Sequence, residues 1–112
     1  MNGVLAKCLE GVYMKKIVLL CAGGLSTSML VAKMREVAAA DSYDCEIEAY
    51  GITEADSVVP ESDITLLGPQ IKFKMDSLRE KYPDKVIEAI DMVAYGMMDG
   101  KKVIDMVRET IG

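Results

Sequence analysis

Histidine is absent from all 112 residues of the sequence. Its absence excludes imidazole ligands for a metal ion, catalytic triads built on serine, histidine and aspartate, and proton shuttles that run through an imidazole ring. A nucleophile in this protein must therefore be activated by some other group.

Cysteine is scarce and irregularly spaced. Cys8, Cys21 and Cys45 stand 13 and 24 residues apart, with no Cys-x-x-Cys pair. An odd number at these spacings indicates neither a disulfide framework nor a metal-binding knuckle, so we expect no metal ion and no cofactor. Reduced thiols are typical of cytoplasmic proteins, in which a single cysteine in a special environment is a candidate nucleophile.

Basic residues are fewer than acidic ones, 13 against 18, which gives a net charge of −5 and argues against a nucleic-acid-binding surface. The length and the 51% of apolar residues fit one globular domain. The uncharged run at residues 17–32 is shorter than the roughly 20 residues that cross a bilayer. Gly23 and Gly24 also interrupt it, so we expect neither membrane insertion nor a signal peptide.

Strand and helix patterns alternate from Met14 onward. Strands are predicted at residues 16–21, 45–50, 64–67 and 85–90, and helices at residues 26–40, 53–59, 71–82 and 103–111. The alternation predicts a single α/β domain, residues 14–112, with a four-stranded parallel sheet flanked by helices on both faces. Residues 1–13 lack this pattern and are interpreted as an extension outside the core, with an extra short helix as the alternative.

Two details of these elements follow from single residues. Apolar and acidic residues alternate from Cys45 to Tyr50, so this strand is expected at an edge of the sheet with one solvated face. The helix at residues 53–59 is expected to be capped by Thr53 and to stop before Pro60.

The candidate functional segment begins at the end of the first predicted strand. Ligands of open α/β sheets bind beyond the carboxyl ends of the strands, and a helix N-terminus presents unpaired N–H groups to an anion. The same field favours a thiolate at Cys21. The alternative is a plain buried cysteine followed by helix-capping hydroxyls. The residues of this candidate anion-binding loop are Ala22, Gly23, Gly24, Leu25, Ser26, Thr27 and Ser28.

The segment KKIVLLCAGGLSTSMLV resembles the phosphorylation-site loop of the enzyme IIB components of the lactose, cellobiose and chitobiose group in the bacterial sugar phosphotransferase system (PTS). The segments LLGPQIKF, at residues 66–73, and AYGMMDGKKV, at residues 94–103, extend this resemblance from about Met14 to the end of the chain.

The resemblance implies a four-stranded parallel sheet and a cysteine that accepts phosphate from a phosphohistidine of the IIA component. The phosphate then passes to a sugar of the cellobiose, chitobiose or lactose type, bound by the membrane IIC component. By position, Cys21 matches the phosphorylated cysteine and the seven residues after it match the phosphate loop. Nothing is transferred onto residues 1–13.

Two alternative functions remain open at this point. The loop also resembles that of low-molecular-weight tyrosine phosphatases, whose C-x5-R-S/T motif would support a phosphatase or an arsenate-reductase-like enzyme. Here Thr27 stands at the arginine position and Ser28 at the next. Without a guanidinium to stabilise transition-state charge, hydrolysis of a phosphocysteine should be slow, which favours a carrier. The other alternative is a non-catalytic regulatory domain that binds a partner.

Further candidates are weaker. Gln70, after the third strand, either lines the site or belongs to a plain turn. The methionines at 92, 97 and 98 form either an adaptable docking surface or part of the core. The remaining acidic candidates are interpreted as solvated or capping residues: Glu46, Glu48, Asp84, Asp91 and Asp99.

Overall fold

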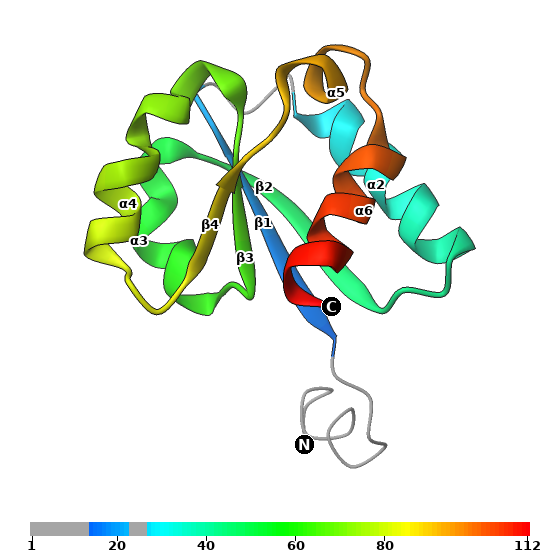
Figure 1. The fold of residues 1–112 in the computed structure, drawn as a ribbon, viewed down its shortest axis with the longest axis horizontal. Helices are drawn as coiled ribbons and strands as arrows, with labels where there is room; N and C mark the ends of the chain where they lie inside the picture. The colour runs from blue at the N-terminus through cyan, green and yellow to red at the C-terminus, as the bar shows by residue number, and fades with distance from the viewer. Residues whose placement is uncertain (1–13, 23–26) are drawn as a thin grey trace.

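A computed structural model describes residues 14–22 and 27–112, so the predicted extension at residues 1–13 lies outside the described residues. The prediction of one α/β domain with a four-stranded parallel sheet is confirmed. The strand order is β2-β1-β3-β4, and every neighbouring pair is parallel (Figure 1). The strands are β1 (Lys15–Cys21), β2 (Cys45–Gly51), β3 (Ile64–Leu67) and β4 (Val86–Ala89).

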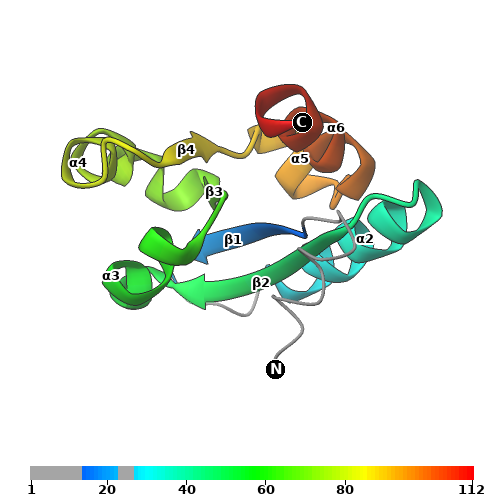
Figure 2. The same cartoon turned by 90° about the horizontal axis from the view of Figure 1, so that it is seen from below.

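Helices cover both faces of the sheet because β1 is apolar on both sides. Ile17 and Leu19 pack in one core with α2 (Ser28–Ala40) and α6 (Gly100–Ile111). Val18 and Leu20 pack in a second core with α3 (Ala55–Val58) and α4 (Met75–Lys81). Figure 2 shows the two helical layers on either side of the strands.

The prediction that β2 is an edge strand is also confirmed. Ile47 is buried, whereas Glu46 and Glu48 are exposed. Arg35 of α2 holds this edge, because its guanidinium donates to the carbonyl oxygen of Ile47 and pairs with Glu48 at 3.3 Å. The two glutamates are therefore the solvated residues that the alternation predicts.

The predicted helix at residues 53–59 is wrong in its details. It is divided into a 3-10 turn η1 (Ile52–Glu54), α3 and a second 3-10 turn η2 (Val59–Glu61), and no side chain caps α3. Pro60 lies inside η2 because an N–H is not needed in the first turn of a helix. Thr53 is therefore not the cap of this helix.

The predicted helix at residues 71–82 is shorter than expected. A 3-10 segment η3 (Pro69–Lys74) comes first, and Ile71 has non-helical φ and ψ of −119° and 21°. Only from Met75 onward does a regular helix, α4, follow. The apolar spacing of Ile71 and Leu78 thus reflects burial on one side of a kinked segment rather than one continuous helix.

The predicted loop before the last helix contains an additional helix, α5 (Met92–Gly96). Asp91 caps it by accepting hydrogen bonds from the backbone N–H groups of Val93 and Ala94. Asp99 caps α6 in the same way through Lys102 N. The interpretation of these two aspartates as capping residues is confirmed.

The start of α6 lies directly against α2. A Cβ atom on Gly100 would stand 2.6 Å from the carbonyl carbon of Lys33, closer than real Cβ contacts. Glycine therefore permits this close approach of two helix backbones. Within residues 14–22 and 27–112, no helix combines the length and the hydrophobicity that a membrane crossing needs.

Candidate functional site

Cys21 is the last residue of β1 and lies at the carboxyl edge of the sheet. Because β1 pairs with β2 on one side and β3 on the other, the strand order reverses beside this residue. Ligands bind at such points in open α/β sheets. The cysteine is 1% exposed, so the fold holds its side chain in place.

The side chain of Thr27 contacts that of Cys21. The two heteroatoms, Sγ and Oγ1, lie 3.5 Å apart, and Thr27 is fully buried. Thr27 occupies the N-cap position of α2, yet its side chain makes no capping hydrogen bond. The geometry therefore does not support helix capping as the role of this hydroxyl and places it in contact with the sulfur of Cys21.

The N-terminus of α2 lies immediately after the loop. The carbonyl of Thr27 accepts the first helical hydrogen bond from Val31 N at 2.9 Å, and no acidic residue occupies the first turn. The positive end of the helix dipole is therefore not neutralised by a carboxylate of its own first turn. Ala22 and Ser28 flank the loop and are both exposed.

Four of the seven residues of the predicted phosphate loop lie outside the described residues: Gly23, Gly24, Leu25 and Ser26. Their contact with a phosphate stays a prediction. The described parts fix both ends of the loop, since Cys21 ends a strand and Thr27 precedes a helix. A ligand between these two ends would meet a thiol, a hydroxyl and a helix N-terminus.

The turn after β3 lies beside the end of β1. Gly68 N donates to the carbonyl of Leu20 at 2.9 Å. The side-chain oxygen of Gln70 lies 3.0 Å from the point where a Cβ of Gly68 would stand, and the ring of Tyr95 lies 3.7 Å from it. Gln70 thus lies over the turn, and α5 packs onto this edge.

Sequence analysis did not predict α5. A signal for it was present, because Asp91 stands just ahead of Val93 and Ala94, and an aspartate at this position is a typical helix cap.

Cys45 lies in a different environment, at the opposite end of the sheet. It begins β2, and burial raises the pKa of its thiol, with a further contribution from the Asp44 carboxylate. Both effects disfavour a thiolate. Cys45 is therefore a poor nucleophile at neutral pH, and Cys8 lies outside the described residues.

The methionines at 92, 97 and 98 lie mainly on the surface. Met92 and Met97 are 74% and 73% exposed, so the core-filling alternative is wrong for both. Met98 is partly buried and has a positive φ of 54°. In the part of the chain that the structure describes, no three acidic or cysteine side chains gather as a metal-binding group.

Comparison with known proteins shows the family of this chain. The family described as "PTS system, Lactose/Cellobiose specific IIB subunit" matches residues 16–106. The chain is 44% identical to the oligo-beta-mannoside-specific EIIB component of Bacillus subtilis (strain 168), over 82% of this chain and 91% of that protein. It is 39% identical to the galactose-specific EIIB component of Lactococcus lactis subsp. cremoris (strain MG1363), over 80% and 90%.

Solved structures of IIB components share the fold. The cellobiose-specific phosphotransferase IIB component of Borrelia burgdorferi has a TM-score of 0.74 at 35% identity and covers 88% of this chain and 93% of its own. The lactose-specific IIB domain of Streptococcus pneumoniae, 20% identical, has a TM-score of 0.73 over 87% and 97% and supports the fold alone. This chain therefore belongs to the lactose/cellobiose-specific IIB family of the sugar phosphotransferase system, whose members act as sugar phosphotransferases.

Proposed function

We propose that Cys21 is the phosphocarrier residue of this IIB component. It accepts a phosphoryl group from a phosphohistidine of the IIA component and passes it to a sugar bound by the membrane IIC component. The observation that carries this proposal is the contact between the Cys21 sulfur and the Thr27 hydroxyl at the start of α2. It joins a nucleophile to a hydrogen-bond donor at the end of a central strand.

Each transfer has a balanced chemistry. The thiolate of Cys21 attacks phosphorus, an S–P bond forms, the P–N bond of phosphohistidine breaks, and the imidazole leaves. In the second transfer a sugar hydroxyl attacks phosphorus and loses its proton, the S–P bond breaks, and the thiolate returns. Backbone N–H groups of the loop and of the α2 N-terminus hold the phosphate oxygens during both steps.

Different residues of the loop contact the phosphate and the sulfur. The backbone from Ala22 to Ser28 surrounds the phosphate, and the hydroxyls of Ser26 and Ser28 donate to its oxygens. Thr27 donates to the sulfur, which stabilises the thiolate before transfer. A neutral hydroxyl at this position supplies no full positive charge, so attack of water on the phosphocysteine stays slow. This argues for a carrier over a phosphatase or an arsenate reductase.

The sugar is of the β-linked disaccharide type, such as cellobiose, chitobiose or lactose. The relatives carry names that differ in their sugar: an oligo-β-mannoside, galactose and cellobiose. Since closely similar IIB components serve different sugars, selection resides in the transporter rather than in this domain. The protein works in the cytoplasm, where both partners reach Cys21.

Residues 1–13 are proposed to be an extension that the domain at residues 14–112 does not need. The alternation of strands and helices begins only at Met14, and β1 begins at Lys15. A chain that starts at Met14 is expected to fold and to accept phosphate as the full chain does. A loss of several kcal/mol of stability would show that the extension packs on the core.

Intact-mass analysis tests the assignment of the carrier residue. The protein is incubated with phosphoenolpyruvate, the general phosphorelay proteins and the IIA component, and then digested to locate the phosphate. Cys45→Ser is expected to gain one phosphoryl group and Cys21→Ser none. A stable phosphate on the Cys21→Ser protein would contradict the proposal.

A further inference from the structure

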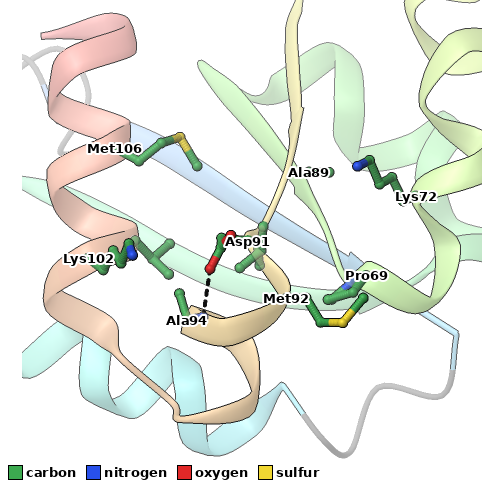
Figure 3. A pocket seen from close by; sticks show the side chains of 10 residues that line it. Pro69, Lys72, Ala89, Asp91, Met92, Ala94, Lys102 and Met106 are labelled. Carbon is green, nitrogen blue, oxygen red and sulfur yellow. Dashed lines mark hydrogen bonds between the residues drawn. The ribbon is translucent and has the colours of Figure 1, made fainter.

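A groove lies at the carboxyl end of β4, between η3 on one side and α6 on the other (Figure 3). It encloses about 500 Å³ and opens to solvent. Its lining residues come from η3, the end of β4, the start of α5 and α6: Pro69, Lys72, Ala89, Ile90, Asp91, Met92, Ala94, Lys102, Val103 and Met106. None of them belongs to the loop between Cys21 and Thr27.

The groove combines an apolar lining with two cations. Lys72 and Lys102 both line it and are exposed, and within residues 14–22 and 27–112 neither takes part in an ion pair. Asp91, the one carboxylate in the lining, accepts two backbone hydrogen bonds at the start of α5. On a chain of net charge −5, this groove is a local basic site.

One apolar side chain of the groove lining, that of Met92, is largely exposed to solvent. Met92 is 74% exposed, and Met106 of α6 contributes a second thioether to the lining. Figure 3 shows the two methionine side chains on either side of Asp91, with Met106 on α6. Methionine adapts its shape to a partner and is common at docking surfaces.

The groove is connected to the reactive end of β1 through one turn. Pro69 lines the groove, and its neighbour Gly68 donates its N–H to the carbonyl of Leu20, the residue before Cys21. A protein that fills the groove therefore lies beside the edge of the sheet at which the sulfur is placed.

We propose that this groove docks the phosphate donor, through an apolar side chain of the donor flanked by carboxylates; this inference rests on the proposed function. Charge distinguishes the donor from the transporter. Cytoplasmic loops of membrane proteins carry an excess of lysine and arginine, which Lys72 and Lys102 would repel. The acidic remainder of the surface suits those basic loops, whereas the lysine-bearing groove suits an acidic, soluble partner.

Calorimetric titration with the unphosphorylated IIA component tests the groove without any phosphoryl transfer. The test variant is Lys72→Glu/Lys102→Glu. The control, Lys85→Glu/Lys101→Glu, changes the net charge equally at residues that do not line the groove. We expect the test variant to raise the dissociation constant about ten-fold at low salt, with a smaller effect as salt increases. The control should bind like the wild type.

A second variant tests the apolar part of the groove. Met92→Ala should weaken donor binding to a similar extent at low and high salt, because burial of a side chain is not screened by ions. Binding of the membrane component in lipid nanodiscs should be unaffected by both groove variants. Loss of transporter binding in place of donor binding would overturn the inference.

The outcomes separate this inference from the proposed function. If the test variant binds the donor as tightly as its control, or if the wild type does not bind the donor, the groove is not its docking site, even when Cys21 takes phosphate. If binding falls as expected but no phosphate reaches Cys21, the docking site stands and the carrier role fails.

Discussion

The sulfur of Cys21 lies 3.5 Å from the hydroxyl oxygen of Thr27, six positions further along the chain. The contact joins the last residue of β1 to the N-cap residue of α2. The contact places a neutral hydroxyl where the C-x5-R-S/T phosphatase motif has a cation. Thr27 therefore lacks the positive charge that hydrolysis of a phosphocysteine needs.

Replacing Thr27 by valine removes this hydroxyl while nearly conserving side-chain volume. A hydrogen bond to a charged group contributes about 1.5–3 kcal/mol, so phosphorylation of Cys21 by the IIA component should slow by roughly ten-fold or more. Thr27→Ser keeps the hydroxyl and should retain most of the rate. Quench-flow measurement with intact-mass detection gives both rates, and equal rates for the valine and serine variants would show that the hydroxyl does not act on the sulfur.

The isolated wild-type protein should hydrolyse p-nitrophenyl phosphate at a negligible rate. The sequence contains no histidine to act as a general acid, and Thr27 replaces the arginine of the phosphatase motif. Release of p-nitrophenol measures this directly. Robust turnover that disappears in Cys21→Ser would make the phosphatase interpretation the better one.

Gly100→Ala should destabilise the protein through a contact between two helices. The added Cβ would stand 2.6 Å from the Lys33 carbonyl carbon and 2.7 Å from Met34 N, both backbone atoms that cannot rotate away. Overpacking of this kind typically costs about 1–3 kcal/mol, measurable by urea unfolding. Gly96→Ala is the matched control, because nothing lies within 4 Å of its added Cβ. A destabilisation by Gly96→Ala as large as that by Gly100→Ala would refute this explanation.

Stability should fall at alkaline pH because of Tyr43 and Cys45. Burial raises the pKa of both side chains, so the folded protein holds their protons more tightly than the unfolded chain. The stabilisation is fully present below the unfolded cysteine pKa of about 8.5 and is lost as pH rises through the folded values. Urea unfolding from pH 7 to about 11.5 measures the decline, in which the Tyr43 contribution begins only above the unfolded tyrosine pKa of about 10.

Tyr43→Phe isolates the tyrosine contribution to this pH dependence. The Tyr43 hydroxyl is buried and has no hydrogen-bond partner in the described part of the chain. Removing it should leave stability at pH 7 unchanged or higher and should make the alkaline decline shallower. A variant that loses stability at pH 7, or that declines as steeply as the wild type, would be inconsistent with a desolvated hydroxyl.

The main features of the fold could be predicted because the strands bear unambiguous patterns. The run from Ile17 to Leu20 is apolar on both faces and lies in the centre of the sheet, whereas the alternation around Ile47 marks the edge. The short helices were harder to predict than the strands. Ile71 has helical spacing but a non-helical backbone, and α5 was missed because its cap, Asp91, stands within a segment that resembles a loop.

Part of the site could also be predicted. The position of Cys21 at the end of a central strand follows from the sequence, because an apolar run ends at this residue and a glycine pair comes soon after it. The contact of Thr27 with the sulfur could not be foreseen, since a hydroxyl before a helix ordinarily caps it. The basic groove depends on α6 returning to β4 across the fold, a long-range relationship that no local pattern encodes.

A single-turnover experiment with labelled phosphate tests the central claim most directly. The protein is phosphorylated by the IIA component, separated from it, and divided between buffer alone and membranes that contain the IIC component and its sugar. We predict that the label stays on the Cys21 peptide in buffer and moves to the sugar with the membranes. Label on another residue, or release as inorganic phosphate at the same rate in both halves, would contradict the assignment of Cys21 as a phosphocarrier.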